Sequence, residues 1–152
     1  MFTEDEFLML LNSAPVIDGA ITETLSDTKL RRLRDDLHRV IRKEAESLVL
    51  TPYLKGFSEH PSIDANGVNW TLTGPVERLL LAEMVLEWSR VNAELPGRLR
   101  ACGNPECNKF LIDHSKPNTA RWCSMASCGN RMKARRFQAR HVESRPQPAE
   151  TV

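Results

Sequence analysis

Apolar residues recur every three or four positions along two long segments of the chain, and this spacing predicts two amphipathic helices. The first runs from Ser26 or Asp27 to about Leu50, with apolar positions at Leu30, Leu33, Leu37, Val40, Ile41, Ala45 and Leu48. The second begins at Pro75 and ends near Leu95, before Pro96-Gly97. Its apolar positions cover more than one narrow stripe, so we expect it to pack on two sides, as a central core helix or as half of a dimer interface.

Shorter patterns complete the N-terminal part of the chain. Residues 3–12 predict a short helix that Thr3 caps. Residues 51–66 contain Pro52, Gly56 and Pro61, with Gly67 just after them, and predict a loop. Apolar and polar positions then alternate, which predicts a short half-buried strand at Val68, Trp70 and Leu72. The expected fold class is therefore mainly α with small β elements, and residues 1–97 form a helical domain.

The composition is that of a globular protein without a membrane span. Of the 152 residues, 41% are hydrophobic and 27% are charged, a balance typical of a soluble domain. Glu83 interrupts the densest apolar stretch, far short of the roughly 20 residues that a spanning helix needs. The first residues are acidic where a secretory signal is basic. We therefore expect no membrane partner and a cytoplasmic location, where thiols stay reduced.

Charge is divided unevenly along the chain. Residues 98–145 carry eleven Lys or Arg against three acids, whereas residues 1–97 carry ten against sixteen. A basic block on an otherwise acidic chain indicates a module that binds a polyanion, beside a body with another role. The alternative at this point is an ordinary solvated basic face.

All four cysteines lie in this basic block, as two C-x4-C pairs separated by fifteen residues: Cys102, Cys107, Cys123 and Cys128. Two close pairs can present four thiolates to one metal, and zinc prefers four thiolates in structural sites. Two disulfides, an iron–sulfur cluster and unrelated buried cysteines are the alternatives. The block has too few apolar residues to fold by burial alone, which favours one structural zinc.

The pattern around the cysteines predicts a knuckle, a β-hairpin, a second knuckle and a basic helix. A short strand is expected at residues 109–113, and a return strand is expected to begin at Arg121-Trp122. A helix is expected from Asn130 to about Val142, with Met132 and Phe137 packed inward. Pro96-Gly97 marks the domain boundary, so the finger covers residues 98–143 and a disordered tail covers residues 144–152.

The basic helix and its surroundings supply candidate contacts to nucleic acid. Guanidinium groups bind phosphates in bidentate fashion, and an amide side chain can reach a base edge. The candidate residues are Arg121, Arg131, Lys133, Arg135, Arg136, Gln138 and Arg140. Two of these cations would offset the formal charge of a zinc tetrathiolate centre. The alternative is a solvated helix whose arginines contact acids of the N-terminal body.

The ordered motif that runs from the second cysteine pair into the helix, "WCSM..CGNR.KARR", resembles the CGNR zinc finger family of bacterial proteins. In that family the finger follows a mostly helical ABATE-type domain, and the proteins are described as stress-induced transcription regulators. The resemblance implies a treble-clef-like finger with the four cysteines as zinc ligands and the basic helix as a nucleic-acid-binding element. The stretch LLNSAP at residues 10–15 is an approximate counterpart of the family's opening.

These observations lead to one main functional hypothesis and two alternatives. The main hypothesis is a zinc-dependent DNA-binding transcription regulator, cytoplasmic and nucleoid-associated, that forms a homodimer through its N-terminal domain. An RNA- or ribosome-associated protein and a zinc-stapled interaction adaptor are the alternatives. We expect no enzyme, because the four histidines are scattered and suggest no nucleophile–base pair. One of them, His114, is a candidate spare metal ligand.

Overall fold

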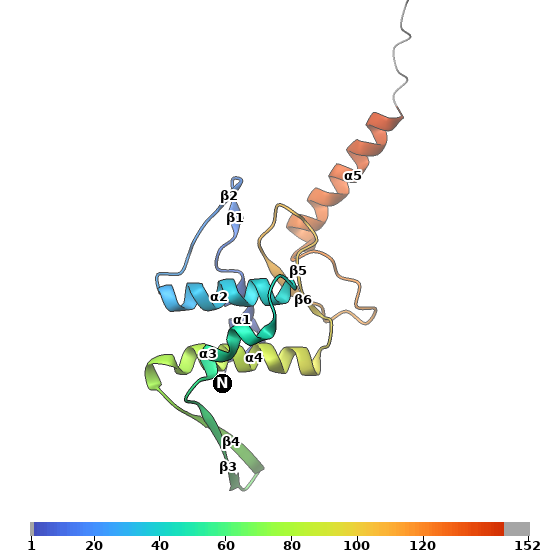
Figure 1. The fold of residues 1–152 in the computed structure, drawn as a ribbon. Helices are drawn as coiled ribbons and strands as arrows, with labels where there is room; N and C mark the ends of the chain where they lie inside the picture. The colour runs from blue at the N-terminus through green and yellow to red at the C-terminus, as the bar shows by residue number, and fades with distance from the viewer. Residues whose placement is uncertain (1, 145–152) are drawn as a thin grey trace, which may run out of the picture.

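A computed structural model describes residues 2–144 of the chain. It is a mixed fold of helices and three small antiparallel two-stranded sheets (Figure 1). The elements, in order, are α1 (Glu4–Leu11), β1 (Val16–Ile17), β2 (Ala20–Ile21), α2 (Thr28–Ile41), η1 (Ser47–Leu50), α3 (Thr51–Leu54), β3 (Ser58–Asp64), β4 (Gly67–Thr73), η2 (Val76–Arg78), α4 (Leu79–Glu94), β5 (Leu99–Ala101), β6 (Phe110–Ile112), η3 (Met125–Gly129) and α5 (Asn130–Glu143). The predicted fold class, helices with small β elements, is confirmed at this level.

Helix α1 begins where the sequence predicts. The Thr3 hydroxyl accepts the backbone amide of Glu6 at 3.3 Å, and the Glu6 carboxylate accepts the backbone amide of Thr3 at 2.8 Å. This reciprocal capping box satisfies two amides that a helix start otherwise leaves unpaired. The helix buries Phe7, Leu10 and Leu11.

Helix α2 starts where the sequence predicts but ends earlier than predicted. The Asp27 carboxylate accepts the backbone amides of Lys29 and Leu30, at 2.7 and 3.1 Å. The helix ends at Ile41, and Lys43 adopts a left-handed φ of 60°, which turns the chain away from the helix axis. Leu48, predicted on the buried stripe, is 72% exposed.

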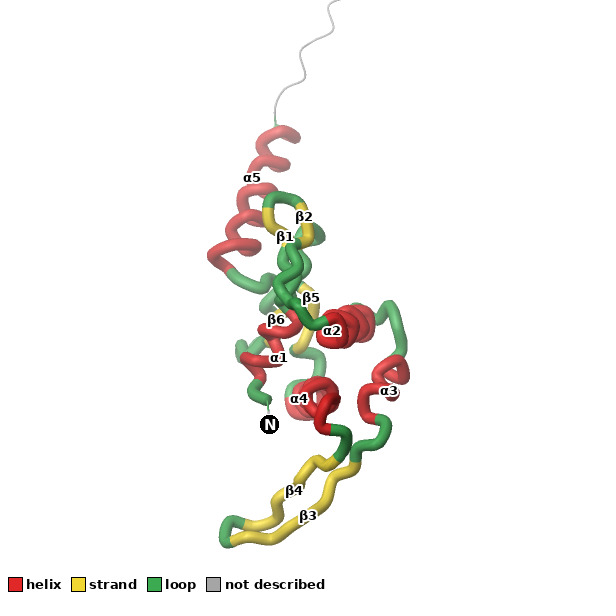
Figure 2. The backbone as a smooth tube through the Cα atoms, turned by 90° about the vertical axis from the view of Figure 1, so that its left-hand side faces the viewer, coloured by secondary structure: helices red, strands yellow, loops and turns green. Residues whose placement is uncertain are grey.

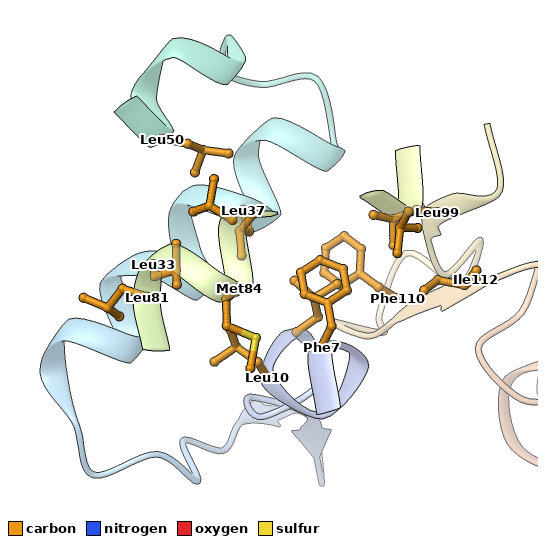
Figure 3. Close-up of a cluster of buried hydrophobic side chains, with 13 residues drawn as sticks. Phe7, Leu10, Leu33, Leu37, Leu50, Leu81, Met84, Leu99, Phe110 and Ile112 are labelled. Carbon is orange, nitrogen blue, oxygen red and sulfur yellow. The ribbon is translucent and has the colours of Figure 1, made fainter. Parts of the chain in front are cut away.

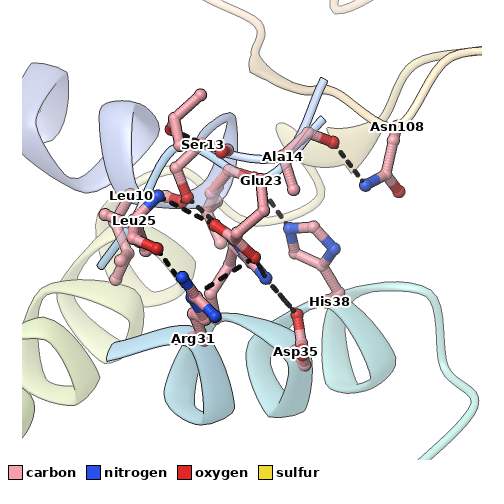
Figure 4. A network of polar contacts seen from close by, with 12 residues as sticks. Leu10, Ser13, Ala14, Glu23, Leu25, Arg31, Asp35, His38 and Asn108 are labelled. Atoms are coloured by element: carbon pink, nitrogen blue, oxygen red, sulfur yellow. Dashed lines mark hydrogen bonds and ion pairs between the residues drawn. The ribbon is translucent and has the colours of Figure 1, made fainter. Parts of the chain in front are cut away.

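One face of α2 carries a buried charge that fixes the preceding segment. The Arg34 guanidinium, 4% exposed, forms two 2.7 Å hydrogen bonds with the Glu23 carboxylate. Figure 4 shows Glu23 within this polar network. This arginine holds the pKa of Glu23 at about 2, well below its usual range. The bidentate pair attaches the segment between β2 and α2 to the helix.

The region predicted as a loop is ordered, and this prediction is wrong. Residues 51–66 contain α3 and the strand β3, which pairs with β4 over its whole length from Ser58↔Thr73 to Asp64↔Gly67. The resulting hairpin projects from the helical body (Figures 1 and 2). Val68 and Trp70 are therefore 59% and 62% exposed, not half-buried, because β4 pairs with β3 in a hairpin that projects from the helices.

Helix α4 is the central core helix. It begins after the short η2 turn and buries Leu81, Met84, Val85 and Val91. These residues belong to one cluster with Leu99 of β5 and Phe110 and Ile112 of β6. Figure 3 shows Leu81 and Met84 of this cluster with the three strand side chains. The hydrophobic core is thus continuous from the N-terminal helices to the strands that flank the first cysteine pair.

Two further expectations concern the C-terminal part. Phe110–Ile112 forms the predicted strand, but its partner is Leu99–Ala101, and the described residues show no strand at Arg121-Trp122. Of the tail predicted to be disordered, Ser144 is the last residue described and 145–152 lie outside the described part. Within residues 2–144, no helix has both the length and the apolar content needed to cross a bilayer.

Candidate metal centre

The first pair of cysteines lies at the turn between β5 and β6. The backbone amide of Cys102 donates to the Lys109 carbonyl at 2.9 Å, which extends the strand ladder into the turn. Inside the turn, the Cys107 amide donates to the Asn104 carbonyl at 3.0 Å. These two hydrogen bonds close a knuckle that directs both thiols to the same side.

The second pair lies where the chain enters α5. Cys123 precedes the π-helical turn η3, and Cys128 is within this turn. The Gly103 amide donates to the Arg121 carbonyl at 2.7 Å, which joins the two cysteine-bearing segments. A Cβ added at Gly103 would lie 3.0 Å from that carbonyl oxygen and 3.2 Å from the Trp122 ring. Glycine at this position therefore allows the two segments to approach closely.

The four thiols converge on one point. The Sγ atoms of Cys102, Cys107, Cys123 and Cys128 all lie within 4.8 Å of one another. The Cys107–Cys123 and Cys123–Cys128 sulfur distances are both 3.7 Å. Four sulfurs arranged tetrahedrally about 2.3 Å from a zinc ion lie about 3.8 Å apart. The donor set and its spacing fit one tetrahedral metal ion, as the sequence predicts.

Neighbouring groups donate hydrogen bonds to the sulfurs. The Cys123 amide donates to Cys102 Sγ at 3.3 Å, and the Asn104 side-chain amide donates to Cys128 Sγ at 3.4 Å. Burial raises the pKa of the Cys128 thiol, but the hydrogen bonds from Asn104 and the other thiols outweigh this and lower the pKa to about 7. Burial raises the pKa values of Cys107 and Cys123, so a metal ion would have to displace their protons.

Asn104 is a supporting residue that the sequence analysis missed. It is 1% exposed, and its side-chain oxygen accepts the Glu106 amide at 3.1 Å while its nitrogen donates to sulfur. A buried amide that orients a metal ligand is typical of the shell around metal sites. The sequence could have indicated Asn104 through its position between the two cysteines of the first C-x4-C pair.

The comparison with known families decides the class of this centre. Residues 98–141 match the family model of the CGNR zinc finger. The metal of the four-cysteine site is therefore zinc. No curated protein matches the chain. The matched range contains all four cysteines, which supports the resemblance seen in the sequence.

With four thiolates as ligands, the zinc of the CGNR finger would be structural. Structural zinc sites are closed by four protein ligands, whereas catalytic sites leave one position for water. His114 does not join the cluster, because its imidazole contacts the Glu4 carboxylate. The hypothesis that His114 is a spare ligand is therefore not supported by the geometry.

Side-chain hydrogen bonds attach the CGNR finger to the helical body. The Asn12 side chain pairs with both backbone groups of Phe110. Asn108 donates to the Ala14 carbonyl at 2.8 Å (Figure 4). Arg42, just after α2, donates to the Asn108 side-chain oxygen at 3.0 Å. These contacts hold the first knuckle against the ends of α1 and α2.

Helix α5 extends away from the rest of the finger (Figures 1 and 2) and has no buried residue. The expectation that Phe137 packs inward is wrong, because its side chain is 61% exposed and stacks on the His141 ring at 4.2 Å between centroids. Met132 is only partly buried. The helix projects beyond the small finger, so no apolar surface faces its last turns.

The predicted nucleic-acid contacts are all on the surface. Along α5 the exposed candidates are Arg131, Lys133, Arg135, Arg136, Gln138 and Arg140. Arg121 is also exposed, and its guanidinium lies over the Trp122 ring at 5.3 Å. Arg135 pairs with Glu106 of the first knuckle at 2.5 Å, so its acidic partner belongs to the finger and not to the N-terminal body.

Proposed function

We propose that the chain is a DNA-binding protein whose CGNR finger presents α5 to the phosphate backbone. The observation that carries this proposal is that α5 has five Lys or Arg residues and no buried side chain. A helix without an apolar contact face gains little by packing on its own protein. Its stability and its charge are both explained if a polyanion is its partner.

The zinc centre has a positioning role in this proposal. Cys128 lies in the turn immediately before α5, so its bond to zinc would fix the start of the helix. The five cations would contact phosphates, and Gln138 would reach a base edge. The arrangement of two knuckles followed by a helix is the treble-clef-like feature that we propose for this finger.

One observation favours a second candidate function, the binding of single-stranded RNA. Recognition of unpaired bases uses exposed aromatic side chains beside positive charge. Phe137 is such a side chain, whereas Phe110 is buried and Trp122 lies under Arg121. Substitution of Phe137 by Ala would therefore weaken RNA binding strongly and duplex DNA binding little.

The test is fluorescence anisotropy of zinc-loaded protein on a random-sequence DNA duplex and on an RNA strand of equal charge. Contact of about five cations with phosphates predicts a slope of log K against log salt near −4 to −5. The variant R135Q/R136Q would flatten this slope by about two. The matched control K43Q/K55Q removes the same charge from the body and would leave the slope unchanged.

Two outcomes would overturn the proposal. A slope that R135Q/R136Q leaves unchanged would show that α5 does not contact phosphates. Salt-insensitive binding to an acidic protein, with no binding to either nucleic acid, would favour the interaction adaptor.

The wider biological role follows from the DNA proposal. We propose that this finger, joined to a helical body, belongs to a bacterial transcription regulator that acts in the cytoplasm at the nucleoid. We propose a binding function and not an enzymatic one. A zinc ion held by four thiolates leaves no coordination position for a reactive water.

We also propose that the chain forms a homodimer through its N-terminal part, at the β3–β4 hairpin. The register places Pro61 opposite Trp70 and Ile63 opposite Val68, so these apolar side chains share one face. This face continues onto Leu86 of α4 through a cleft that Trp70 also lines. The hairpin residues 58–73 contain no Lys or Arg, which disfavours nucleic acid or an anionic membrane as the partner.

A second copy would cover this face by an isologous contact, with the same apolar ribbon on both subunits. Sedimentation velocity would then give a dimer mass for the wild type and a monomer mass for I63E/V68E. The control T71E, on the polar face of the same hairpin, would remain a dimer. A monomer mass for the wild type at high micromolar concentration would exclude this contact.

A further inference from the structure

A cavity in the helical body, separate from the cleft beside Trp70, has a charge distribution that the DNA-binding role does not explain. It has a volume of about 250 Å³ and lies where α2, α3 and the start of α4 meet. These three helices lie side by side in Figure 2, away from α5. Its walls include Lys29 and Arg32 of α2, Tyr53 of α3, and Arg78 and Leu81 at the start of α4.

The cavity carries more positive than negative charge. Among the described residues, none of the three cations Lys29, Arg32 and Arg78 forms an ion pair with a carboxylate. The only acid in the walls is Asp36. Its carboxylate already accepts the Tyr53 hydroxyl at 2.6 Å and lies 3.6 Å from Arg39. Three cations thus face a space in which the single carboxylate has other partners.

Arg78 is held in place by neutral groups. Its guanidinium donates to the Pro52 carbonyl at 3.2 Å and to the Lys55 carbonyl at 2.6 Å. The same group lies over the Phe57 ring at 5.6 Å. These contacts fix the guanidinium without cancelling its charge, and they leave further N–H groups for a ligand. A cation that is already ordered loses little entropy when an anion binds.

We propose that this cavity binds a small organic anion, with a carboxylate or phosphate held by Lys29, Arg32 and Arg78. The apolar part of the walls, from Val49 and the 6% exposed Leu81, would contact a short hydrocarbon portion of the ligand. The volume lies just below the range of small-molecule pockets and is too small for a nucleic acid. The site is therefore distinct from the proposed DNA contacts of α5.

The position of the cavity gives such a ligand a structural consequence. Arg78 and Phe57 lie at the base of the β3–β4 hairpin, one after its second strand and one before its first. An anion held by Arg78 and Arg32 would connect this base to α2. Binding would then restrict the hairpin relative to the helical body.

The test is a titration of zinc-loaded full-length protein with inorganic phosphate, and separately with benzoate, at constant ionic strength in chloride. Amide NMR spectra and calorimetry would follow binding. We expect saturable one-site binding of at least one probe, with the largest shifts at Arg32, Tyr53 and Arg78. The variant K29Q/R32Q would weaken this binding about tenfold or more, because it removes two charge-assisted contacts.

The matched control R136Q/R140Q removes the same charge from α5 and would leave the dissociation constant unchanged. All four substituted side chains are exposed, so both variants are expected to fold, and far-UV circular dichroism would check this. Binding of phosphate alone or of benzoate alone would identify which anion chemistry the cavity accepts. Non-saturable binding, or equal weakening by both variants, would overturn the proposal. Neither readout involves DNA, so the result is independent of the function proposed for α5.

Discussion

The Asn12 side chain pairs with both backbone groups of Phe110, 98 positions later in the chain. Its amide donates to the Phe110 carbonyl at 3.2 Å, and its oxygen accepts the Phe110 amide at 2.7 Å. Asn12 is also the C-cap of α1. One side chain therefore replaces a missing neighbouring strand for β6 and attaches the CGNR finger to the first helix.

Replacement of Asn12 by Ala would destabilise the whole chain. It would leave two backbone groups of the buried strand β6 without partners, at a cost of about 2–3 kcal/mol. Urea unfolding of the zinc-loaded protein would measure the change. The control N92A removes an asparagine from the exposed side of α4 and would lower stability little. Equal stability of N12A and wild type would show that water replaces these hydrogen bonds.

Cobalt substitution would report on the metal centre. Four thiolates in tetrahedral array would give intense visible absorption bands and bind one ion per chain. The variant C128S would lower the intensity and the affinity. Added thiol or azide would not change the spectrum, because no coordination position is open. A spectrum that responds to azide would indicate an exchangeable ligand and contradict a closed site.

His38 would make stability depend on pH. Its ring is 6% exposed, donates from Nε2 to the Leu11 carbonyl at 2.7 Å, and packs on Phe110. Burial lowers its pKa from 6.5 to about 4, and the positive charges of Arg42 and Arg34 act in the same direction. Folding therefore favours the neutral ring. This contribution is fully present above pH 6.5 and is lost as pH falls from 6.5 towards 4.

The free energy of unfolding is expected to fall by up to about 3 kcal/mol over this interval, and by about 2 kcal/mol at pH 5. Urea unfolding of wild type and H38Q at pH 7 and pH 5 would isolate this effect. Protonation of the zinc ligands destabilises both proteins equally, so the difference between them is the relevant quantity. A difference that does not change with pH would exclude His38 as its source.

The two glycines that follow cysteines in the finger would respond differently to Ala. At Gly103 an added Cβ would lie 3.0 Å from the Arg121 carbonyl oxygen, which the backbone holds in place. We expect G103A to lose about 1–3 kcal/mol. At Gly129 the nearest atom is the Met125 sulfur at 2.7 Å, on a side chain that can move. G129A would therefore lose less, and thermal unfolding with bound zinc would rank the two variants.

Removal of the acid beside α5 would strengthen DNA binding. Glu106 pairs with Arg135, although both side chains are largely exposed, at 66% and 46%. The variant E106Q would free Arg135 for phosphate and remove a negative charge from the interface. We expect a two- to fivefold gain in affinity at low salt, because this corresponds to the free energy of one exposed ion pair. Anisotropy would measure it, and E77Q, distant in sequence and exposed, is the control.

Local patterns predicted the elements that depend on nearby residues. Thr3 was identifiable as a helix cap, and the start of α2 was placed at Ser26 or Asp27, because capping side chains bond amides two or three positions away. The spacing of the cysteines predicted a common metal site for the same reason, since each C-x4-C turn presents two thiols. The basic character of α5 was likewise evident from its composition.

Partners far apart in the chain were not predictable from local patterns. The alternation at Val68 and Trp70 indicated a strand, but its partner β3 was predicted as a loop because Pro61 and Gly56 obscured it. Similarly, β6 was expected to pair with Arg121-Trp122 and pairs instead with Leu99–Ala101. A hydrophobic pattern specifies which face of a strand is apolar but not which segment pairs with it.

The sequence by itself determined where α1 and α2 start, the four zinc ligands and the concentration of positive charge at the C-terminal end. Only the tertiary structure decided that α5 projects without a buried face, and that Lys29, Arg32 and Arg78 line one cavity. Caps and cysteine knuckles form between residues close in the chain, so the order of residues is sufficient to reveal them. The exposure of a helix and the convergence of distant side chains on one cavity depend on how the whole core packs. This core brings together Phe7, Val91 and Phe110 from three distant segments.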